Sequence, residues 1–173
     1  TIGRTLAGLQ EATSGEITYK NINLLHPGKE QYRFLKKDIQ MIFQDPYGSL
    51  NPSIPIGEAI AEPLKAQGLY PKKEIKNIVV HWLEKVGLSA DHYSRYPHAF
   101  SGGQRQRIVI ARALALKPAF VICDECVSAL DVSVQAQILN LLNDLKKELG
   151  FTCLFISHDL SVVHYLCDRI MVI

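Results

Sequence analysis

The chain has 173 residues, of which 47% are hydrophobic, so it can form one globular domain with a full core, with or without a small inserted lobe. Its 19 basic and 17 acidic residues give a formal net charge of +2. This near balance argues neither for nor against a nucleic acid as a partner. No apolar run approaches the roughly 20 residues of a membrane-spanning helix, which excludes such a segment from this sequence.

The first 31 residues predict a helix, a strand and a loop, in that order. Residues 1–9, TIGRTLAGL, are typical of a helix interior, and no N-cap precedes them. We therefore expect the chain to begin inside its first helix. Residues 13–25, TSGEITYKNINLL, predict a turn followed by one strand with partial alternation. Residues 26–31, HPGKEQ, predict a loop because they contain proline and glycine.

Four short apolar runs predict strands of a parallel sheet that is buried on both faces. They are IQMIF at 39–43, FVIC at 120–123, CLFIS at 153–157 and IMVI at 170–173. Helical patterns separate the last three runs, and strands that alternate with helices are typical of an α/β core. We assign residues 1–45 and 117–173 to this core.

The clearest predicted helix covers residues 133–150. Apolar side chains recur along it at the spacing of one helix face, namely Ile138, Leu141, Leu142, Leu145 and Leu149. Ser133 is a suitable N-cap for this helix, and Gly150 is suitable for the position after its last turn.

Residues 46–116 predict a helical lobe inserted into the core. Prolines punctuate this segment at Pro46, Pro52, Pro55, Pro63, Pro71 and Pro97. The short stretches between them, such as EIKNIVVHWLEKVGL at 74–88, have a helical pattern, and no pattern of a buried strand occurs there. The sequence therefore predicts an α/β unit with a helical insertion.

Two adjacent carboxylates, Asp124 and Glu125, follow the apolar run FVIC. The carboxyl ends of parallel strands face the ligand crevice of an open α/β sheet. Adjacent acids repel each other unless a cation or a proton separates their roles. We therefore expect Asp124 to hold Mg²⁺, directly or through water, and Glu125 to polarise a water molecule. The alternative is a solvated loop after a strand.

Two further polar residues follow predicted strands and are expected at the same sheet edge. His158 follows LFIS, and a histidine there can bridge a phosphate oxygen and a neighbouring carboxylate. Gln44 follows IQMIF, and its amide can ligate a metal or orient water without titrating. Taken alone, a residue of either type at a strand end is more often an ordinary exposed side chain.

The segment SGGQ at residues 101–104 precedes a predicted helix at 104–116. Gly102 and Gly103 would let backbone N–H groups approach an anion, and the dipole of the helix adds a favourable field. Ser101 could donate its hydroxyl to the same anion. Three arginines add positive charge nearby, namely Arg105, Arg107 and Arg112. The alternative is an ordinary turn before a helix, and the usual phosphate loop, G-x-x-x-x-G-K-S/T, occurs nowhere in the chain.

Four cysteines are present, and two of them, Cys123 and Cys126, form a C-x-x-C pattern. Neither a second such pair nor an H-x-x-x-H follows, which disfavours a metal site. We expect small buried thiols in a reducing compartment, with Cys126 as a potential site of oxidation.

Taken together, these segments resemble the ATP-binding cassette (ABC) ATPases. SGGQRQRIVIARALALKPAFVICDE at 101–125 is similar to the signature loop, its helix and the Walker B strand of that family. QMIFQD at 40–45 resembles the Q-loop, SALD at 128–131 the D-loop and ISHD at 156–159 the H-loop. FQDPYGSLNP and YPHAFSGGQRQRI look most like the subfamily that serves oligopeptide, dipeptide and nickel importers.

The resemblance implies a P-loop NTPase (RecA-like) core with a mostly parallel sheet and an inserted α-helical subdomain, truncated at both ends and lacking Walker A. Asp124 would hold Mg²⁺, and Glu125 would be the general base for the attacking water. His158 would contact the γ-phosphate and support Glu125. Gln44 would sense Mg²⁺ and water and link the site to a transmembrane partner.

The resemblance also assigns nucleotide contacts to the signature segment, which comprises Ser101, Gly102, Gly103 and Gln104. Asp131 would act across a dimer interface. Thr1 corresponds to the residue just after the magnesium-binding Ser or Thr of Walker A. Tyr47 and the SLNP segment at 49–52 would lie near the groove that receives a helix of a membrane subunit.

An ABC ATPase of this subfamily would use ATP and Mg²⁺ to power an importer of peptides or similar solutes. The implied partners are a second ATPase subunit bound head to tail, transmembrane permease subunits and, indirectly, an extracytoplasmic solute-binding protein, without nucleic acid. The implied location is peripheral, at the cytoplasmic face of the plasma (inner) membrane.

Two alternatives stay open. One is a soluble ABC ATPase of DNA repair or translation that has no membrane partner. The other is a catalytically incompetent chain that supplies only a signature surface to a partner. Because residues 1–173 contain no Walker A loop, we expect them alone to bind ATP weakly and to hydrolyse it negligibly.

Overall fold

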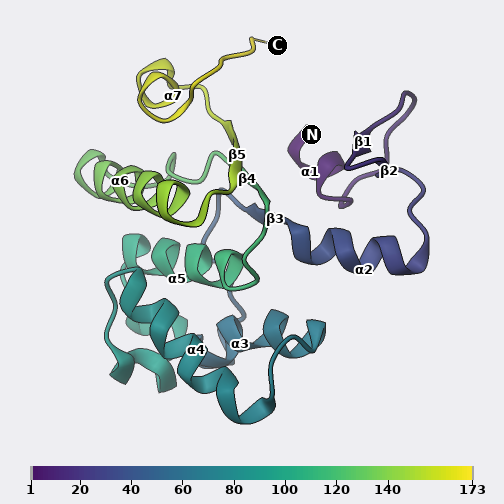
Figure 1. Ribbon diagram of the computed structural model, residues 1–173. Helices are drawn as coiled ribbons and strands as arrows, with labels where there is room; N and C mark the ends of the chain where they lie inside the picture. The colour runs from purple at the N-terminus through teal and green to yellow at the C-terminus, as the bar shows by residue number, and fades with distance from the viewer. Residues whose placement is uncertain (1, 173) are drawn as a thin grey trace.

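The computed structural model describes residues 2–172 and contains a three-stranded parallel sheet (Figure 1). In spatial order its strands are β3 (Ile39–Ile42), β4 (Phe120–Asp124) and β5 (Thr152–Ile156). Ile42 pairs with Cys123 and Asp124 pairs with Ile156, so the three carboxyl ends lie at one edge of the sheet. The predicted α/β class and three of the four predicted strands are therefore confirmed.

The fourth apolar run, IMVI, is not a strand, and this prediction is wrong. Residues 170–172 have no regular secondary structure, and Met171 and Val172 are 75% and 87% exposed. A strand needs a neighbour that completes its backbone hydrogen bonds, and no strand within residues 2–172 pairs with this run. Ile173 lies outside the described residues.

Helices cover both faces of the sheet (Figure 1). On one face, α1 (Ile2–Leu6) approaches so closely that a Cβ on Gly3 would lie 3.0 Å from Ile156 Cδ1. On the other face lie α5 (Gly102–Leu114), α6 (Val132–Leu149) and α7 (Leu160–Leu166), which bury their apolar sides in one large core. Burial on both faces explains why the strands are continuous apolar runs.

The N-cap of helix α6 lies two residues earlier than predicted. Asp131, not Ser133, is the N-cap, because its carboxylate accepts a hydrogen bond from Val134 N at 3.0 Å. The Ser133 hydroxyl donates to the same carboxylate at 2.8 Å and so supports the cap instead of forming it. The end of the helix is as predicted, since Gly150 adopts the left-handed conformation with φ of 70°.

The segment before β3 differs from its prediction in two respects. The expected single strand is a small antiparallel hairpin of β1 (Thr18–Tyr19) and β2 (Ile22–Asn23). Its turn residues Lys20 and Asn21 have φ of 47° and 63°, as a tight primed turn requires. The expected loop ends early, because α2 (Lys29–Asp38) begins inside it, and Gly28 N donates to the side chain of Gln31 at 2.9 Å.

The segment between β3 and α5 is helical, as predicted. It contains α3 (Ile56–Gln67), α4 (Lys72–Lys85) and two 3₁₀ turns, η1 (Ala90–Ser94) and η2 (Pro97–Ala99). Gly57 on α3 lies against Tyr93, and a Cβ there would be 2.5 Å from the tyrosine ring. The buried core runs without interruption from this lobe through α5 to the sheet. The proposed division of the chain at residues 46 and 116 stays a prediction.

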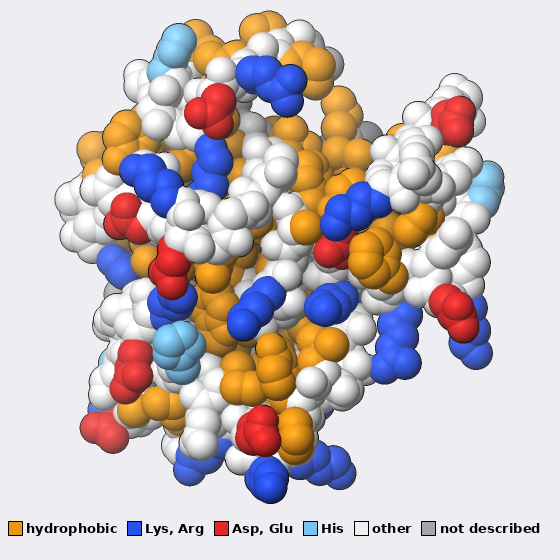
Figure 2. Space-filling model, viewed as in Figure 1, with side chains coloured by type: hydrophobic (Ala, Val, Ile, Leu, Met, Phe, Trp, Pro, Cys, Tyr) orange, Lys and Arg blue, Asp and Glu red, His pale blue; other side chains and the backbone are white. Residues whose placement is uncertain are grey.

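The surface carries charges of both signs close together. Figure 2 shows lysines and arginines interspersed with acidic residues and apolar side chains on one face, in keeping with the small net charge. Among the helices of residues 2–172, none combines the length and the apolar character that crossing a membrane requires.

Candidate functional site

The polar residues that follow the three parallel strands come together at one edge of the sheet. Gln44 lies two residues after β3, Glu125 directly follows β4, and His158 lies two residues after β5. Since β4 is the central strand, the Glu125 carboxylate lies between the other two side chains. The strand pattern of the sequence predicts this convergence.

The carboxylate of Glu125 is the centre of this group. Gln44 Nε2 donates to Glu125 Oε2 at 3.0 Å, and His158 Nδ1 lies 3.7 Å from the same oxygen. The Glu125 side chain is 34% exposed, whereas the His158 side chain is 75% exposed. A partly shielded carboxylate with one oxygen held by an amide can accept a proton from a water on its free side.

The backbone of Glu125 is held in an unusual conformation. Its φ is 48°, in the left-handed region that residues other than glycine seldom occupy. Glu125 N donates to Ile156 O at the end of β5 at 2.9 Å, which ties the turn to the neighbouring strand. Such strained residues cluster at functional sites, where the surrounding structure holds them in place.

Ser128 is a member of this group that the sequence alone did not single out. Its hydroxyl donates to Glu125 O at 2.9 Å, so the lone pairs of the Ser128 hydroxyl oxygen can still accept hydrogen bonds. One of them accepts a second contact from Gln44 Nε2, at 3.3 Å. A signal was present in the sequence, because a serine hydroxyl can bond back to the carbonyl three residues earlier.

Asp124 and Gln44 could hold a divalent cation at this edge. Within residues 2–172 the Asp124 carboxylate makes no hydrogen bond or ion pair, and the Gln44 amide nitrogen is occupied while its oxygen is not. No cluster of three or more His, Cys, Asp or Glu side chains suited to a metal occurs in the described part of the chain. One carboxylate and one amide oxygen fit Mg²⁺, which usually takes few protein ligands and completes its shell with phosphate and water.

The signature segment forms the capped start of α5. Ser101 Oγ accepts from Gln104 N at 3.3 Å, and Gln104 Oε1 accepts from Ser101 N at 3.0 Å, which makes a reciprocal capping box. The hydroxyl proton of Ser101 remains available to a ligand. The helix therefore begins with N–H groups and a hydroxyl directed outward from a fixed turn.

The Asp131 carboxylate is exposed and caps α6. Hydrogen bonds from Val134 N and the Ser133 hydroxyl lower the pKa of Asp131 below its ordinary value, so the group stays charged. Its predicted action across a dimer interface stays a prediction. Thr1, the other residue predicted to lie near the nucleotide, is outside the described residues.

Comparison with known proteins decides the family. The family model described as "ABC transporter" matches residues 1–128, which include the Q-loop, signature and Walker B segments. The chain belongs to the ABC transporter family. The match ends at Ser128, so the H-loop histidine lies beyond it.

Two transport ATP-binding proteins are similar to almost all of this chain. The dipeptide transport ATP-binding protein DppF of Haemophilus influenzae is 53% identical over 99% of this chain and 53% of its own length. The putative oligopeptide transport ATP-binding protein YkfD of Bacillus subtilis is 55% identical over 98% of this chain and 52% of its own length. The chain thus spans about half the length of these relatives.

A solved ABC structure has the same fold. It is a dimeric post-hydrolysis state of the ATP-binding cassette MJ0796 bound to ADP and Pi, and it superposes with a TM-score of 0.80 at 28% identity. The likeness covers 95% of this chain and 71% of the other. It confirms the P-loop NTPase fold with a mostly parallel sheet and a helical subdomain.

The three arginines of the signature helix are held by hydrogen bonds within the chain. Each donates to a backbone carbonyl of the helical lobe or its borders: Arg105 to Pro97 O at 2.7 Å, Arg107 to Val86 O at 2.8 Å and Arg112 to Ser49 O at 2.9 Å. The turn of the helix directs these side chains into the lobe. Arg105 is buried, and its guanidinium lies 3.7 Å from the centre of the Tyr47 ring.

The cysteines are free thiols packed behind the Walker B turn. Cys123 and Cys126 are buried, and Cys153 Sγ lies 3.7 Å from Cys123 Sγ. Hydrogen bonding to Cys126 and Cys153, together with burial, raises the pKa of the Cys123 thiol well above its ordinary value. A neutral buried thiol is unreactive, which agrees with the expected packing role.

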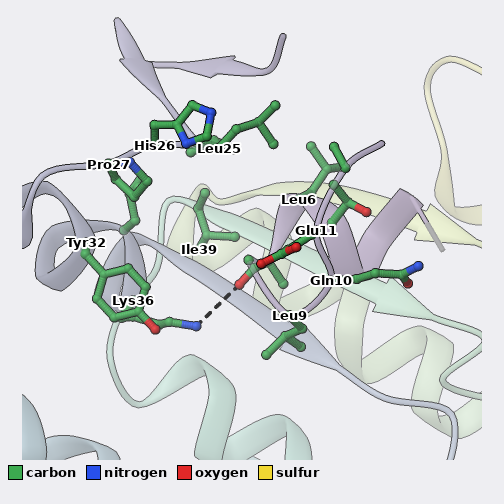
Figure 3. A pocket seen from close by; sticks show the side chains of 16 residues that line it. Leu6, Leu9, Gln10, Glu11, Leu25, His26, Pro27, Tyr32, Lys36 and Ile39 are labelled. Carbon is green, nitrogen blue, oxygen red and sulfur yellow. Dashed lines mark hydrogen bonds between the residues drawn. The ribbon is translucent and has the colours of Figure 1, made fainter. Parts of the chain in front are cut away.

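A cavity lies away from the Glu125 group (Figure 3). Its volume is about 750 Å³, and α1, the loop after it and α2 enclose it. Lys36 Nζ reaches across to Ala7 O at 3.4 Å, as the dashed line in Figure 3 marks. None of its lining residues belongs to the ABC motifs described above, so cavity volume alone would not locate the group of motif residues around Glu125.

Proposed function

We propose that the full-length protein is the ATP-binding and ATP-hydrolysing subunit of an ABC importer of peptides or similar solutes. The observation that carries the proposal is the contact of Gln44 Nε2 with Glu125 Oε2 at 3.0 Å, with His158 beside the same oxygen. The names of the similar transport proteins from Haemophilus influenzae and Bacillus subtilis support the class of solute.

In the proposed mechanism, Glu125 is the general base that accepts a proton from the water attacking the γ-phosphate of ATP. Gln44 holds one carboxylate oxygen in place and is itself held by the Ser128 hydroxyl, so that the other carboxylate oxygen can face the water. His158 contacts the γ-phosphate and the carboxylate from the opposite side. Asp124 and Gln44 would hold Mg²⁺, which neutralises charge on the phosphates when it is bound.

We infer that the signature segment acts on a nucleotide bound to another subunit. The outward N–H groups of Gly102 and Gly103 and the hydroxyl proton of Ser101 suit an anion that approaches from outside the chain. Asp131 would act across the same interface. A head-to-tail pair of ATPase subunits, identical or paralogous, would then share two nucleotide sites.

The proposed contact with the permease lies on the helical lobe. Tyr47 is 65% exposed, and the segment that follows it borders a groove of about 410 Å³ that Arg112 and Glu62 also line. A helix of a transmembrane permease subunit would dock there and place this chain peripherally at the cytoplasmic face of the plasma membrane. A solute-binding protein outside the membrane would act on it only through the permease.

Co-purification from membranes tests the proposal. The full-length protein is expressed with its two candidate permease subunits, and the complex is assayed for ATP hydrolysis. We expect a membrane-bound complex that hydrolyses ATP in the presence of Mg²⁺. A stable protein without membrane partners, whose ATP hydrolysis nucleic acid stimulates, would instead establish the DNA-repair or translation class.

A further inference from the structure

The start of α5 lies against the start of α6 without room for a side chain at Gly103. A Cβ on Gly103 would lie 2.4 Å from Val134 Cγ1, a distance that real Cβ contacts do not show. The preceding Gly102 is less crowded, since its nearest neighbour, Leu130 Cδ2, would lie at 3.6 Å, an ordinary van der Waals distance. Packing within this chain therefore requires glycine at position 103 and not at position 102.

Val134 cannot easily move out of the way. Its side chain is β-branched and has one strongly preferred rotamer in a helix. Its backbone N–H is bonded to the Asp131 carboxylate at 3.0 Å, which fixes the first turn of α6 to the D-loop. Further along the same two helices, Arg107 Nη2 donates to Gln137 Oε1 at 3.3 Å and adds a second link between them.

We propose that Val134 is a positioning residue that joins the D-loop to the signature segment of the same chain. The connection runs from the Asp131 cap through Val134 to the backbone of Gly103. A displacement of the D-loop at the subunit interface would thereby move the signature segment with it. This consequence rests on the proposed function, whereas the contact between the two helices does not.

Three variants of the full-length protein test this connection: Gly103→Ala, Val134→Ala and the double variant. We expect Gly103→Ala to lower kcat about 100-fold, since misplacing a contact group by about 1 Å has an effect of that size, with a smaller change in KM. Val134→Ala removes the clashing methyl group. The double variant should therefore recover most of the loss, to within a few fold of Val134→Ala alone.

Val132 offers the matched control, because it has the same side chain in the same helical turn but is 82% exposed. Adding Val132→Ala to Gly103→Ala should recover nothing. A Gly103→Ala/Val134→Ala variant as inactive as Gly103→Ala would overturn the proposal and show that glycine serves only the approach to the phosphate.

Amide hydrogen exchange of the nucleotide-free protein gives a readout besides activity. Gly103→Ala should speed exchange at Gln104 and Val134, the two capped amides, and Val134→Ala should restore slow exchange at Gln104. Unchanged exchange in Gly103→Ala would contradict the proposed contact between Gly103 and Val134. If the unsubstituted protein hydrolysed no ATP, the proposed function would be wrong. The exchange measurement would still test the positioning role of Val134, because it does not depend on ATP hydrolysis.

Discussion

At the scale of single residues, the Glu125 carboxylate is positioned by its backbone as much as by its neighbours. The left-handed conformation at φ of 48° costs roughly 1 kcal/mol for a residue with a side chain. The bonds to Ile156 O and from the Ser128 hydroxyl offset that cost and direct the carboxylate toward Gln44. The same residue in an ordinary strand end would face solvent without a fixed direction.

Ser128→Ala should lower kcat of the full-length protein about fivefold, which corresponds to one hydrogen bond of about 1 kcal/mol, with little change in KM. The hydroxyl accepts a hydrogen bond from the Gln44 amide and so orients it, which places the effect on Gln44. Steady-state ATP hydrolysis measures both constants. Ser128→Thr keeps the hydroxyl and should stay close to the unsubstituted protein.

A double-mutant cycle makes this prediction sharper. In a Gln44→Ala background, Ser128→Ala should lower kcat less than it does alone, because the amide that it orients is already absent and only its bond to Glu125 O is lost. Fully additive losses would show that Ser128 acts independently of Gln44.

At the scale of elements, the helical lobe depends on a tyrosine that joins η1 to α3. Tyr93 Oη donates to Glu58 Oε1 at 2.9 Å, and its ring fills the space that the missing side chain of Gly57 leaves. Tyr93→Phe should lower the free energy of unfolding by about 1 kcal/mol, as measured by chemical denaturation. Tyr96→Phe, at an exposed tyrosine of the same lobe, is the matched control and should change little.

The same hydrogen bond predicts a dependence of stability on pH. Burial, with a hydrogen bond to the Glu58 carboxylate, raises the pKa of Tyr93 to about 12. Because the folded pKa lies above the ordinary value of 10.0, this contribution is complete below pH 10 and is lost as the pH rises toward 12. The stability difference between the unsubstituted protein and Tyr93→Phe should therefore shrink over that interval. A constant difference would contradict the assignment.

The sequence predicts the strands and helices that have a local, repeated pattern of apolar residues. It fails where contacts with another segment of the chain determine the structure. The runs that became β3, β4 and β5 are continuous and apolar because helices cover both sheet faces. IMVI has the same composition but pairs with no described strand, so it stays irregular. Asp131 and Ser133 are both good caps, and only the three-dimensional position of Val134 N selects the aspartate.

The candidate site was predictable to a similar extent. The order of polar residues after parallel strands places Gln44, Glu125 and His158 at one edge before any coordinates are known. The directions of Arg107 and Arg112 were not predictable, because the carbonyl groups that accept their hydrogen bonds lie 21 and 63 positions away in the chain. Contacts between distant segments, such as Gly103 with Val134, were hidden for the same reason.

At the scale of the whole molecule, the proposed importer subunit would use separate surfaces for nucleotide and for permease. Tyr47→Glu should weaken co-purification of the full-length protein with its permease, because a charge replaces an exposed ring that Arg105 supports from behind. Quantitative co-purification from detergent extracts measures the effect. Tyr32→Glu on α2, at another exposed tyrosine, should leave recovery unchanged, and an equal loss in both variants would remove Tyr47 from the docking surface.

Turnover of ATP by the assembled full-length protein, with and without Glu125→Gln, tests the central claim most directly. The amide has the shape of the carboxylate but cannot accept the proton, while Asp124 is unchanged. We predict that the variant turns over at least about 100-fold more slowly and retains bound ATP. Equal turnover in the two proteins would contradict the account by removing Glu125 from the reaction.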